Sequence, residues 1–287
     1  AVGNGINSIA YSYNGINWLG LGETIFTSTG ERVSWNGTMW IATGSGTNTI
    51  AYSYNGLNWT GIGTTIFTTG FGIAWNGAIW VAVGEGGNTV ATSTDGLTWT
   101  GRGSITANKN IAYGKNSSGN GLWIAIGGIG TFNLATSTDG ITWTPRNVMG
   151  TNAPGVCIAY GNGLWVAGVT GSSKMASSTD GINWTGRGAT VFNGNPSSGR
   201  SIAYANNLWV AVGEGGNTIA TSTNGTVWTG RGDTVFTSNG NGVVYANNLW
   251  VAVGRGGNVI ATSTDGINWT GRGATNGFTT AGYGVAS

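Results

Sequence analysis

A seven-residue pattern, S-x-(D/N)-G-x-x-W, occurs seven times in this 287-residue chain and constrains its fold more than any other feature. We call it the turn motif and number the repeat units 1 to 7 by its copies, which are Ser12–Trp18, Ser53–Trp59, Ser93–Trp99, Ser137–Trp143, Ser178–Trp184, Ser222–Trp228 and Ser263–Trp269. Consecutive motif tryptophans lie 41, 40, 44, 41, 44 and 41 residues apart. A period of about 40–45 residues is the size of one four-stranded propeller blade.

Unit 7 illustrates the four strands that each unit is predicted to contain. The first spans residues 242–246, and the second, over 249–254, is apolar on both faces, as a strand between neighbouring sheets must be. After a glycine-rich turn the third strand spans 259–264, and Asp265-Gly266 turns the chain back. The fourth, over 267–272, places Ile267 and Trp269 on one face, which is typical of a half-exposed outer strand.

The two chain ends match two parts of one unit. Residues 1–3 match the end of a second strand and residues 282–286 match a first strand, whereas the N-x-x-W-V segment that links these strands in the other six units is absent. Either this blade closes without the segment, or the native chain continues beyond both ends. We therefore predict an all-β fold, a seven-bladed β-propeller of four-stranded antiparallel blades, in a single domain over residues 1–287, with the ring closed by the N- and C-termini sharing one blade. The predicted blades are 282–287 with 1–22, 31–63, 71–103, 109–146, 155–188, 200–232 and 241–273.

The composition excludes several classes of protein. The 56 glycines follow no G-X-Y period and are accompanied by only 3 prolines, so the chain is not collagen-like. Hydrophobic residues make up 39% of the chain and 15 residues are tryptophan, which is enough to build a core and argues against disorder. Charged residues make up only 7%, with a net charge of +2, which predicts no nucleic-acid partner. No apolar stretch is long enough to predict membrane insertion.

The chain also contains few of the residue types that commonly bind metals or act in catalysis. It has no histidine, the commonest general base and metal ligand. Its single cysteine, Cys157, allows no internal disulfide and lies where other units have glycine, which predicts a small, buried and unreactive residue. We therefore expect no metal site and no cofactor.

The turn motif resembles the Asp-box (BNR-like) repeat, whose usual form is S-x-D-x-G-x-T-W. In this chain the motif is one residue shorter between Asp or Asn and Trp in all seven copies. The wider unit, W-V-A-V-G-x-G-x-N-x-I-A-x-S-x-D-G-x-x-W, is also similar to repeats of uncharacterised bacterial and viral surface proteins. The resemblance implies a propeller fold, and it implies that the motif is a folding element placed away from any active centre.

The acids of the turn motif are predicted to be structural. They are Asp95, Asp139, Asp180 and Asp265, and Asn14, Asn55 and Asn224 stand at the equivalent positions. Asparagine keeps a hydrogen-bond acceptor but cannot act as a general acid, so the exchange indicates that these side chains accept hydrogen bonds from the backbone of their own turns.

The remaining acids do not form a predicted catalytic pair. By the resemblance, sialidase-like chemistry requires clustered arginines, a tyrosine nucleophile and two acids at the propeller axis. Glu85 and Glu214 occupy the same hairpin in blades three apart, Glu23 and Asp233 follow outermost strands, and Glu31 lies just before an innermost strand. Because glycoside hydrolysis needs two carboxyl groups within roughly 5–9.5 Å of each other, we expect no catalytic residues and disfavour a glycoside hydrolase.

Four arginines recur in W-T-G-R-G directly after the turn motif: Arg102, Arg187, Arg231 and Arg272. Equivalent positions on fourth strands lie about 14 Å farther out than the first strands, so these arginines cannot converge on one small ligand. They are candidates for separate peripheral anion or glycan contacts. The alternative, which we favour, is that charge on an outermost strand discourages strand addition by another chain.

Units 1 and 2 depart from this pattern, because they lack the arginine and carry tyrosines where most other units have threonine. The candidate ligand- or partner-binding residues are therefore Tyr11, Tyr13, Tyr52, Tyr54, Leu21 and Ile62. Exposed aromatic rings stack on sugars or anchor protein interfaces, and an uncharged edge can accept a partner. Recent duplication of one unit would explain the same differences.

Together these features predict a non-catalytic binding module, a multivalent lectin-like or adhesion propeller that is secreted or exposed on a cell or virion surface. An uncharged surface rich in Gly, Thr and Asn suits neutral polar polymers, and the repeat offers several similar sites for avidity. The alternative is a structural or assembly protein of a cell surface or virion that docks through units 1 and 2. Expected partners are glycans or a surface protein, and homo-oligomers are compatible with either function.

Overall fold

The computed structural model describes residues 1–128, 132–147, 154–188, 190–193, 199–274 and 277–287. Every helix or strand assigned in these ranges is a β-strand, so the predicted all-β class is confirmed. The same ranges contain no helix long and apolar enough to cross a membrane.

Units 4 to 7 each form a separate antiparallel sheet of four strands, paired in chain order. In unit 4 these are β12 (Asn110–Lys115), β13 (Gly121–Ile126), β14 (Leu134–Ser137) and β15 (Thr144–Arg146), and in unit 5 β16 (Gly155–Gly161), β17 (Leu164–Val169), β18 (Met175–Ser178) and β19 (Thr185–Gly186). Unit 6 contains β20 (Gly199–Ala205), β21 (Leu208–Gly213), β22 (Ile219–Ser222) and β23 (Thr229–Gly230), and unit 7 contains β24 (Asn239–Ala246), β25 (Leu249–Arg255), β26 (Ile260–Ser263) and β27 (Thr270–Gly271).

Units 2 and 3 have the same four strands each, but one residue pair between β5 and β8 joins them into one sheet. Unit 2 contains β4 (Thr29–Trp35), β5 (Trp40–Ser45), β6 (Ile50–Ser53) and β7 (Thr60–Gly61). Unit 3 contains β8 (Thr69–Trp75), β9 (Trp80–Glu85), β10 (Val90–Ser93) and β11 (Thr100–Gly101).

Unit 1 is assembled from both ends of the chain. Its strands are β28 (Ala281–Gly284), β1 (Val2–Asn4), β2 (Ala10–Tyr11) and β3 (Leu19–Gly20). β1 pairs with β28, a bridge between Val2 and Ile9 links β1 to the segment that leads into β2, and β2 pairs with β3. The predicted match of residues 282–286 to a first strand and residues 1–3 to a second strand therefore agrees with this pairing.

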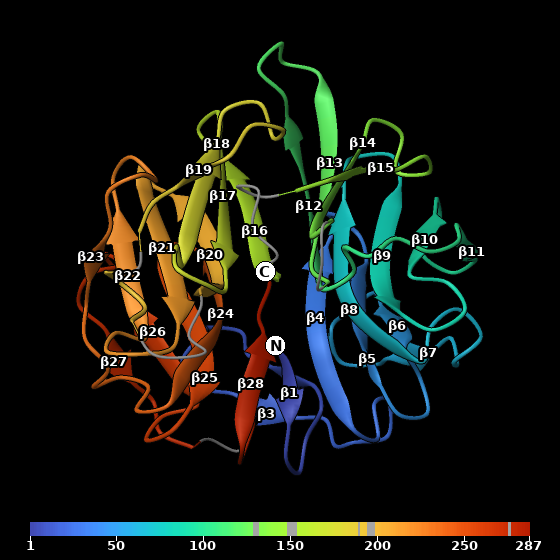
Figure 1. Ribbon diagram of the computed structural model, residues 1–287. Coiled ribbons are helices and arrows are strands. Elements are labelled where there is room, and N and C mark those ends of the chain that lie inside the picture. The colour runs from blue at the N-terminus through green and yellow to red at the C-terminus, as the bar shows by residue number, and fades with distance from the viewer. Residues whose placement is uncertain (129–131, 148–153, 189, 194–198, 275–276) are drawn as a thin grey trace.

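Figure 1 shows the sheets standing around a common centre. First strands such as β4, β16 and β24 lie toward the middle, whereas last strands such as β11, β23 and β27 lie at the periphery (Figure 1). Both chain ends lie near the centre, and β28 contacts β24 on one side and β4 on the other.

Large aromatic residues fill the spaces between neighbouring sheets. The second-strand tryptophans Trp80, Trp123, Trp165, Trp209 and Trp250 are all at most 1% exposed, whereas their counterpart in unit 2, Trp40, is only half-buried. Each stacks on an aromatic residue of the first strand in its own unit, with ring centroids 4.7–5.0 Å apart. Pairs of this geometry stabilise a core beyond the area that they bury.

Several strand boundaries differ from the sequence prediction; in unit 7 the first strand begins at Asn239, not 242, and the third covers Ile260–Ser263, not 259–264. The fourth strand of unit 7 covers only Thr270–Gly271, not 267–272, because the carboxylate of Asp265 accepts the backbone N–H groups of Ile267 and Asn268 at 2.8 Å and keeps both residues in the turn. Ile267 is consequently exposed and does not share a buried face with Trp269. The strand β4 also begins earlier than expected, since Thr29 pairs with Ser45.

Candidate functional site

The turn motif forms a closed hydrogen-bond network, which unit 3 illustrates. Oδ1 of Asp95 accepts the backbone N–H groups of Leu97 and Thr98 at 2.8 and 2.7 Å, and the hydroxyl of Ser93 donates to the same oxygen at 2.9 Å. The indole Nε1 of Trp99 donates to the carbonyl of Gly96 at 3.1 Å. The asparagines of units 1, 2 and 6 accept the equivalent backbone bonds. The turn acids are therefore structural acceptors, as predicted.

These hydrogen bonds also keep the turn carboxylates ionised. The backbone N–H of Thr98 and then that of Leu97 lower the pKa of Asp95 from 3.8 to about 2, and the corresponding groups in unit 4 do the same to Asp139. The pKa of Asp265 is lowered as well, first by the backbone N–H of Asn268. Carboxylates held in this state are poor general acids near neutral pH.

The recurring arginines are engaged within their own units. Nε donates to a third-strand hydroxyl ten residues earlier: Arg102 to Thr92 at 2.8 Å, Arg187 to Ser177 at 2.7 Å, Arg231 to Thr221 at 2.9 Å and Arg272 to Thr262 at 2.9 Å. Arg146 makes the same bond to Thr136 at 3.3 Å. The sequence analysis did not predict these pairs. They could have been recognised because the hydroxyl residue and the arginine ten positions later are replaced together in units 1 and 2.

In units 1 and 2 the threonine becomes tyrosine and the arginine becomes an aliphatic residue. Leu21 and Ile62 are half-buried and pack against the hydrophobic clusters of their units, so they do not form the bare apolar edge that the sequence suggested. Their backbone N–H groups donate to the carbonyls of Ile9 and Ile50 at 2.9 Å, as the backbone N–H of Arg102 does to that of Val90. Ile62 belongs to the same hydrophobic cluster as Tyr52, whereas Leu21 packs with Val2, Ile9 and Phe26.

The four tyrosines form two similar pairs, which we call the aromatic platforms. The rings of Tyr11 and Tyr13 meet edge to face with centroids 5.6 Å apart, and those of Tyr52 and Tyr54 do so at 5.9 Å. The first ring of each pair is half-buried, and the second is exposed. The structure thus brings together the tyrosines within each unit, as two separate sites.

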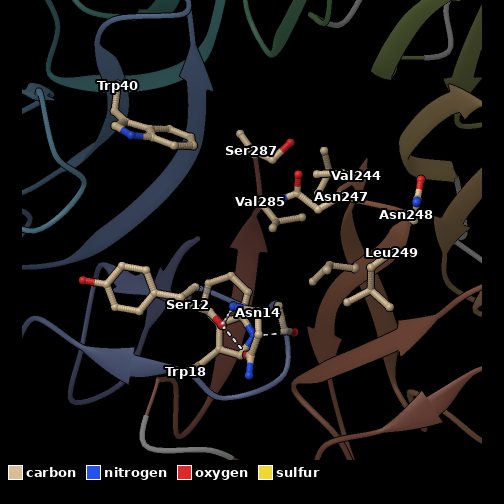
Figure 2. Close-up of a pocket in the computed structure, with 15 residues that line it drawn as sticks. Ser12, Asn14, Trp18, Trp40, Val244, Asn247, Asn248, Leu249, Val285 and Ser287 are labelled. Atoms are coloured by element: carbon tan, nitrogen blue, oxygen red, sulfur yellow. Dashed lines mark hydrogen bonds between the residues drawn. The ribbon is translucent and has the colours of Figure 1, made fainter.

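A cavity of about 550 Å³ opens between units 7 and 1, and we call it the seam cavity (Figure 2). Its apolar lining includes Trp18, Trp40, Val244, Leu249, Val251 and Val285. Its polar lining includes Ser12, Tyr13, Asn14, Asn247, Asn248 and Ser287, without any Asp, Glu, Lys or Arg side chain. A second cavity of about 80 Å³ nearby is lined by Tyr11, Trp40 and Trp59 among others. The sequence analysis predicted neither cavity.

The sequence analysis did not single out Arg32, which lies on the innermost strand of unit 2. Nη1 of Arg32 on β4 donates to the carbonyl oxygens of Glu31 and Tyr283 at 2.8 and 3.0 Å, and its Nη2 reaches the carbonyl of Arg200 on β20 at 3.4 Å. Burial lowers the pKa of Arg32, while the nearby Glu31 acts in the opposite direction. Arg32 thus links innermost strands of units 1, 2 and 6. Glu31 itself lies within β4, which corrects the expectation that it precedes an innermost strand.

The acids Glu85 and Glu214 and the single cysteine have defined surroundings. Glu85 pairs with Lys109 at 2.7 Å and Glu214 with Arg200 at 2.8 Å, so each of these acids has its own basic partner. Within the described ranges no three His, Cys, Asp or Glu residues are grouped so that they could hold a metal ion. Cys157 is buried, and burial raises the pKa of its thiol to about 12.

Comparison with known proteins identifies the fold but no family. No family model matches the sequence, and no curated protein matches it. The chain is similar to the crystal structure of virginiamycin B lyase from Staphylococcus aureus, with a TM-score of 0.69 and 12% identity over 84% of this chain and 83% of that one. It is similar to YCF48 bound to D1 peptide, with a TM-score of 0.58 and 15% identity over 84% and 81% of the two chains.

A third similar structure is the GH74 enzyme of Niastella koreensis, with a TM-score of 0.60 and 22% identity. The match covers 84% of this chain but only 37% of the enzyme, so this chain spans little more than a third of that protein. These neighbours differ from one another in name and activity, and identities this low relate the chains by fold alone. The chain thus has a propeller-like all-β fold built from four-stranded antiparallel sheets.

Proposed function

We propose that this protein is a non-catalytic binding module that holds carbohydrate on its two aromatic platforms. The observation that carries the proposal is the repeated edge-to-face pairing of Tyr11 with Tyr13 and of Tyr52 with Tyr54. In each pair the half-buried ring holds the second ring at the surface, where Tyr13 is 84% and Tyr54 60% exposed. Large exposed rings of limited flexibility are suited to stacking on the apolar face of a sugar.

The electrostatics of the platforms favour a neutral ligand. The turn residues of units 1 and 2 are Asn14 and Asn55, not aspartates, and Leu21 and Ile62 stand in place of arginines. Units 1 and 2, which carry the tyrosines, therefore lack both the turn aspartate and the arginine that follows the turn motif in most other units. An uncharged glycan requires no ion pair at such a site, and two similar sites on one molecule add avidity. The arginines of the other units remain candidates for peripheral contacts only.

We also infer that the seven units form a closed seven-bladed ring in one domain over residues 1–287, with unit 1 shared by the two chain ends. The pairing of β1 with β28 and the contacts of β28 with β24 and β4 support this architecture. The repeat belongs, by this proposal, to the Asp-box type in a shortened form, and the protein acts outside the cell or on a cell or virion surface. It needs no cofactor for this role.

A glycan array probed with the purified chain in multivalent form tests the proposal. Binding is expected to concentrate on one class of neutral sugar and to fall by about a hundredfold in the Tyr13→Thr/Tyr54→Thr double variant, since both contacts and their avidity are lost. Threonine is the residue that the other five units carry at this position, so the variant is expected to fold normally. Val227→Thr, which removes an exposed apolar residue from unit 6, is the matched control and should leave binding unchanged. If the double variant binds glycans as tightly as the wild type, the aromatic platforms are not the glycan-binding sites.

A second function, docking onto a partner protein in an assembly, is favoured by exposed apolar residues in unit 1. Ile6, Tyr13, Ile16 and Leu19 are all exposed within fourteen residues of sequence. One of the similar structures, YCF48, is seen with a bound peptide. If docking is the function, the chain should bind no glycan and should form oligomers or complexes whose mass, measured by light scattering, falls on Leu19→Asn substitution.

A further inference from the structure

The innermost strands of six units carry a β-bulge at the same place. In unit 6 Gly199 pairs with Gly213 and Ser201 with Val212, so Arg200 between them has no pairing partner on β21. The residues set apart in this way in units 1, 2, 3, 5, 6 and 7 are Tyr283, Glu31, Phe71, Val156, Arg200 and Asn241. No two of them are alike, although the units otherwise repeat closely. A bulge re-aims one side chain and is common beside functional sites.

The polar bulge residues of units 6, 7 and 1 are connected to one another. Nη2 of Arg200 pairs with Oε2 of Glu214 at 2.8 Å, and the backbone of Glu214 forms a bridge with Asn239 at the start of β24. Nδ2 of Asn239 donates to Oδ1 of Asn241 at 3.0 Å. Nδ2 of Asn241, which is buried, donates to the carbonyl of Gly282 at 2.8 Å. The contacts thus run from unit 6 through unit 7 into unit 1.

Arg32 of unit 2 closes this circuit. Its Nη1 donates to the carbonyl of Tyr283 and its Nη2 to the carbonyl of Arg200. Nδ2 of Asn4 donates to the hydroxyl of Tyr283 at 3.4 Å. The strands β4, β24 and β28, which carry part of the circuit, lie toward the middle of the molecule (Figure 1). We call the circuit the axial cluster, and its members are Asn4, Arg32, Arg200, Asn239, Asn241 and Tyr283.

Three polar atoms of the axial cluster are buried without a hydrogen-bond partner: Oδ1 of Asn4, Oδ1 of Asn239 and Nε of Arg200. In the part of the chain that the structure describes, six buried side-chain atoms are in this state, so half of them gather here. Buried polar atoms are normally paired, because an unpaired one costs stability. The side chains of Arg200 and Glu214 are 35% and 24% exposed, so the cluster is open on one side. A ligand that enters there meets the three atoms after side-chain rotations of the kind common on binding.

The charges of the axial cluster favour an uncharged ligand. Arg200 already has Glu214 as its counter-ion, and Arg32 donates to three carbonyl oxygens. What the three unpartnered atoms require is two donors and one acceptor, and a hydroxyl group can be either. We propose that the axial cluster binds a neutral polyhydroxylated ligand, either a single sugar ring or the end of a glycan.

This site is separate from the aromatic platforms. Strands β4 and β6 run in the same direction, because both pair antiparallel with β5. The axial cluster lies toward the start of the first strands, with Arg200 second in β20 and Asn239 first in β24, whereas Tyr54 directly follows the third strand β6. The two sites therefore lie at opposite ends of the strands, and each can be tested without the other.

Titration of the 287-residue chain with glucose, galactose, mannose and N-acetylglucosamine, followed by saturation-transfer NMR and calorimetry, tests the proposal. At least one of these sugars should bind at a saturable site with a dissociation constant on the order of 1 mM, as expected for a ligand of this size. Glucuronate should bind no more tightly than the neutral sugars, because both guanidinium groups are already compensated. Tighter binding of glucuronate would overturn the assignment of a neutral ligand.

Variants taken from other units locate the binding. Arg200→Val introduces the bulge residue of unit 5, and Asn239→Thr introduces the residue that units 2 and 3 carry at this position, so both are expected to fold. Each should weaken sugar binding at least about tenfold. Phe71→Val makes the same replacement at the bulge of unit 3, outside the axial cluster, and should leave binding unchanged.

The proposal is overturned if no sugar of the panel shows saturable binding to the wild type. It is also overturned if Arg200→Val and Asn239→Thr, checked for folding by their thermal transitions, both bind as tightly as the wild type. The Tyr13→Thr/Tyr54→Thr variant should retain this binding, and its loss there would assign the sugar to the platforms instead. Failure of the axial cluster and failure of the platforms are thus distinguishable.

Discussion

In unit 7, Nε of Arg272 donates a hydrogen bond to Oγ1 of Thr262 at 2.9 Å, which joins the third strand to the end of the fourth. Four other units make the same bond between an arginine and a third-strand hydroxyl. Units 1 and 2 have Tyr11 with Leu21 and Tyr52 with Ile62 instead. In units 1 and 2 both members of the polar pair are thus replaced together, the hydroxyl residue by tyrosine and the arginine by an aliphatic residue.

This pairing predicts that Arg272 and Thr262 are energetically coupled. Arg272→Leu alone should lower the free energy of unfolding by about 0.5–1.5 kcal/mol, because the nearly buried hydroxyl of Thr262 loses a charged donor. Adding Thr262→Tyr recreates the pair of units 1 and 2 and should recover part of the loss. Urea denaturation of both single variants and the double variant gives the coupling energy, and strictly additive effects would contradict the pairing.

The turn carboxylates predict a loss of stability in acid. The pKa values of Asp95 and Asp139 are about 2 in the folded chain and near 3.8 without its hydrogen bonds, so the unfolded chain binds protons first as the pH falls. Their contribution to stability is complete above about pH 4 and is lost progressively toward pH 2.

Replacement of Asp95, Asp139, Asp180 and Asp265 by asparagine tests this prediction, because asparagine keeps the acceptor but does not titrate. The fourfold variant should unfold with nearly the same free energy at pH 3 as at pH 7, as followed by chemical denaturation, whereas the wild type should lose stability. An equal pH dependence in both proteins would show that other groups are responsible.

Two glycines with similar backbone angles predict different costs for the same substitution. Gly266 has φ = 74° and Gly273 has φ = 72°, so an alanine at either position costs about 1–2 kcal/mol in backbone strain. A Cβ atom at Gly273 meets nothing within 4 Å, whereas one at Gly266 approaches Leu208 and Trp250 to 3.0 Å or less. Gly266→Ala should therefore lower the melting temperature clearly more than Gly273→Ala, and equal shifts would contradict the close packing of the turn motif against the core.

Cys157 is predicted to be inert in the folded protein. Its side chain is 1% exposed, its Sγ donates to the carbonyl of Gly199 at 3.2 Å, and burial raises the pKa of the thiol to about 12. A thiol reagent such as iodoacetamide should label it only after unfolding, because the thiolate is the reactive species. Mass spectrometry of the native and denatured chain gives the answer, and rapid native labelling would disprove the buried position.

Much of the local structure was predictable from the sequence. The turn motif could be interpreted in advance because its hydrogen bonds join residues at most three apart, as from Asp265 to Asn268. The same short-range bonds shortened the fourth strand, and here the prediction was wrong, since alternation of Ile267 and Trp269 resembles a strand although the turn already holds Ile267. The tyrosines of units 1 and 2 were singled out from the sequence as exposed, but Tyr11 and Tyr52 are half-buried. Neither the pairing of the rings within each unit nor the partial burial of Leu21 and Ile62 was foreseen.

The sequence by itself determined the repeat period, the four strands of each unit and the chemistry of the turns, because each depends on residues that are close along the chain. Only the tertiary structure decided which side chains meet across the molecule. The bond from Arg32 to the carbonyl of Tyr283 joins residues 251 positions apart, and the seam cavity lies between unit 7 and a unit built from both chain ends. Periodicity specifies what every unit shares, whereas these sites arise where one unit differs from its neighbours, and their shape is set by packing between sheets.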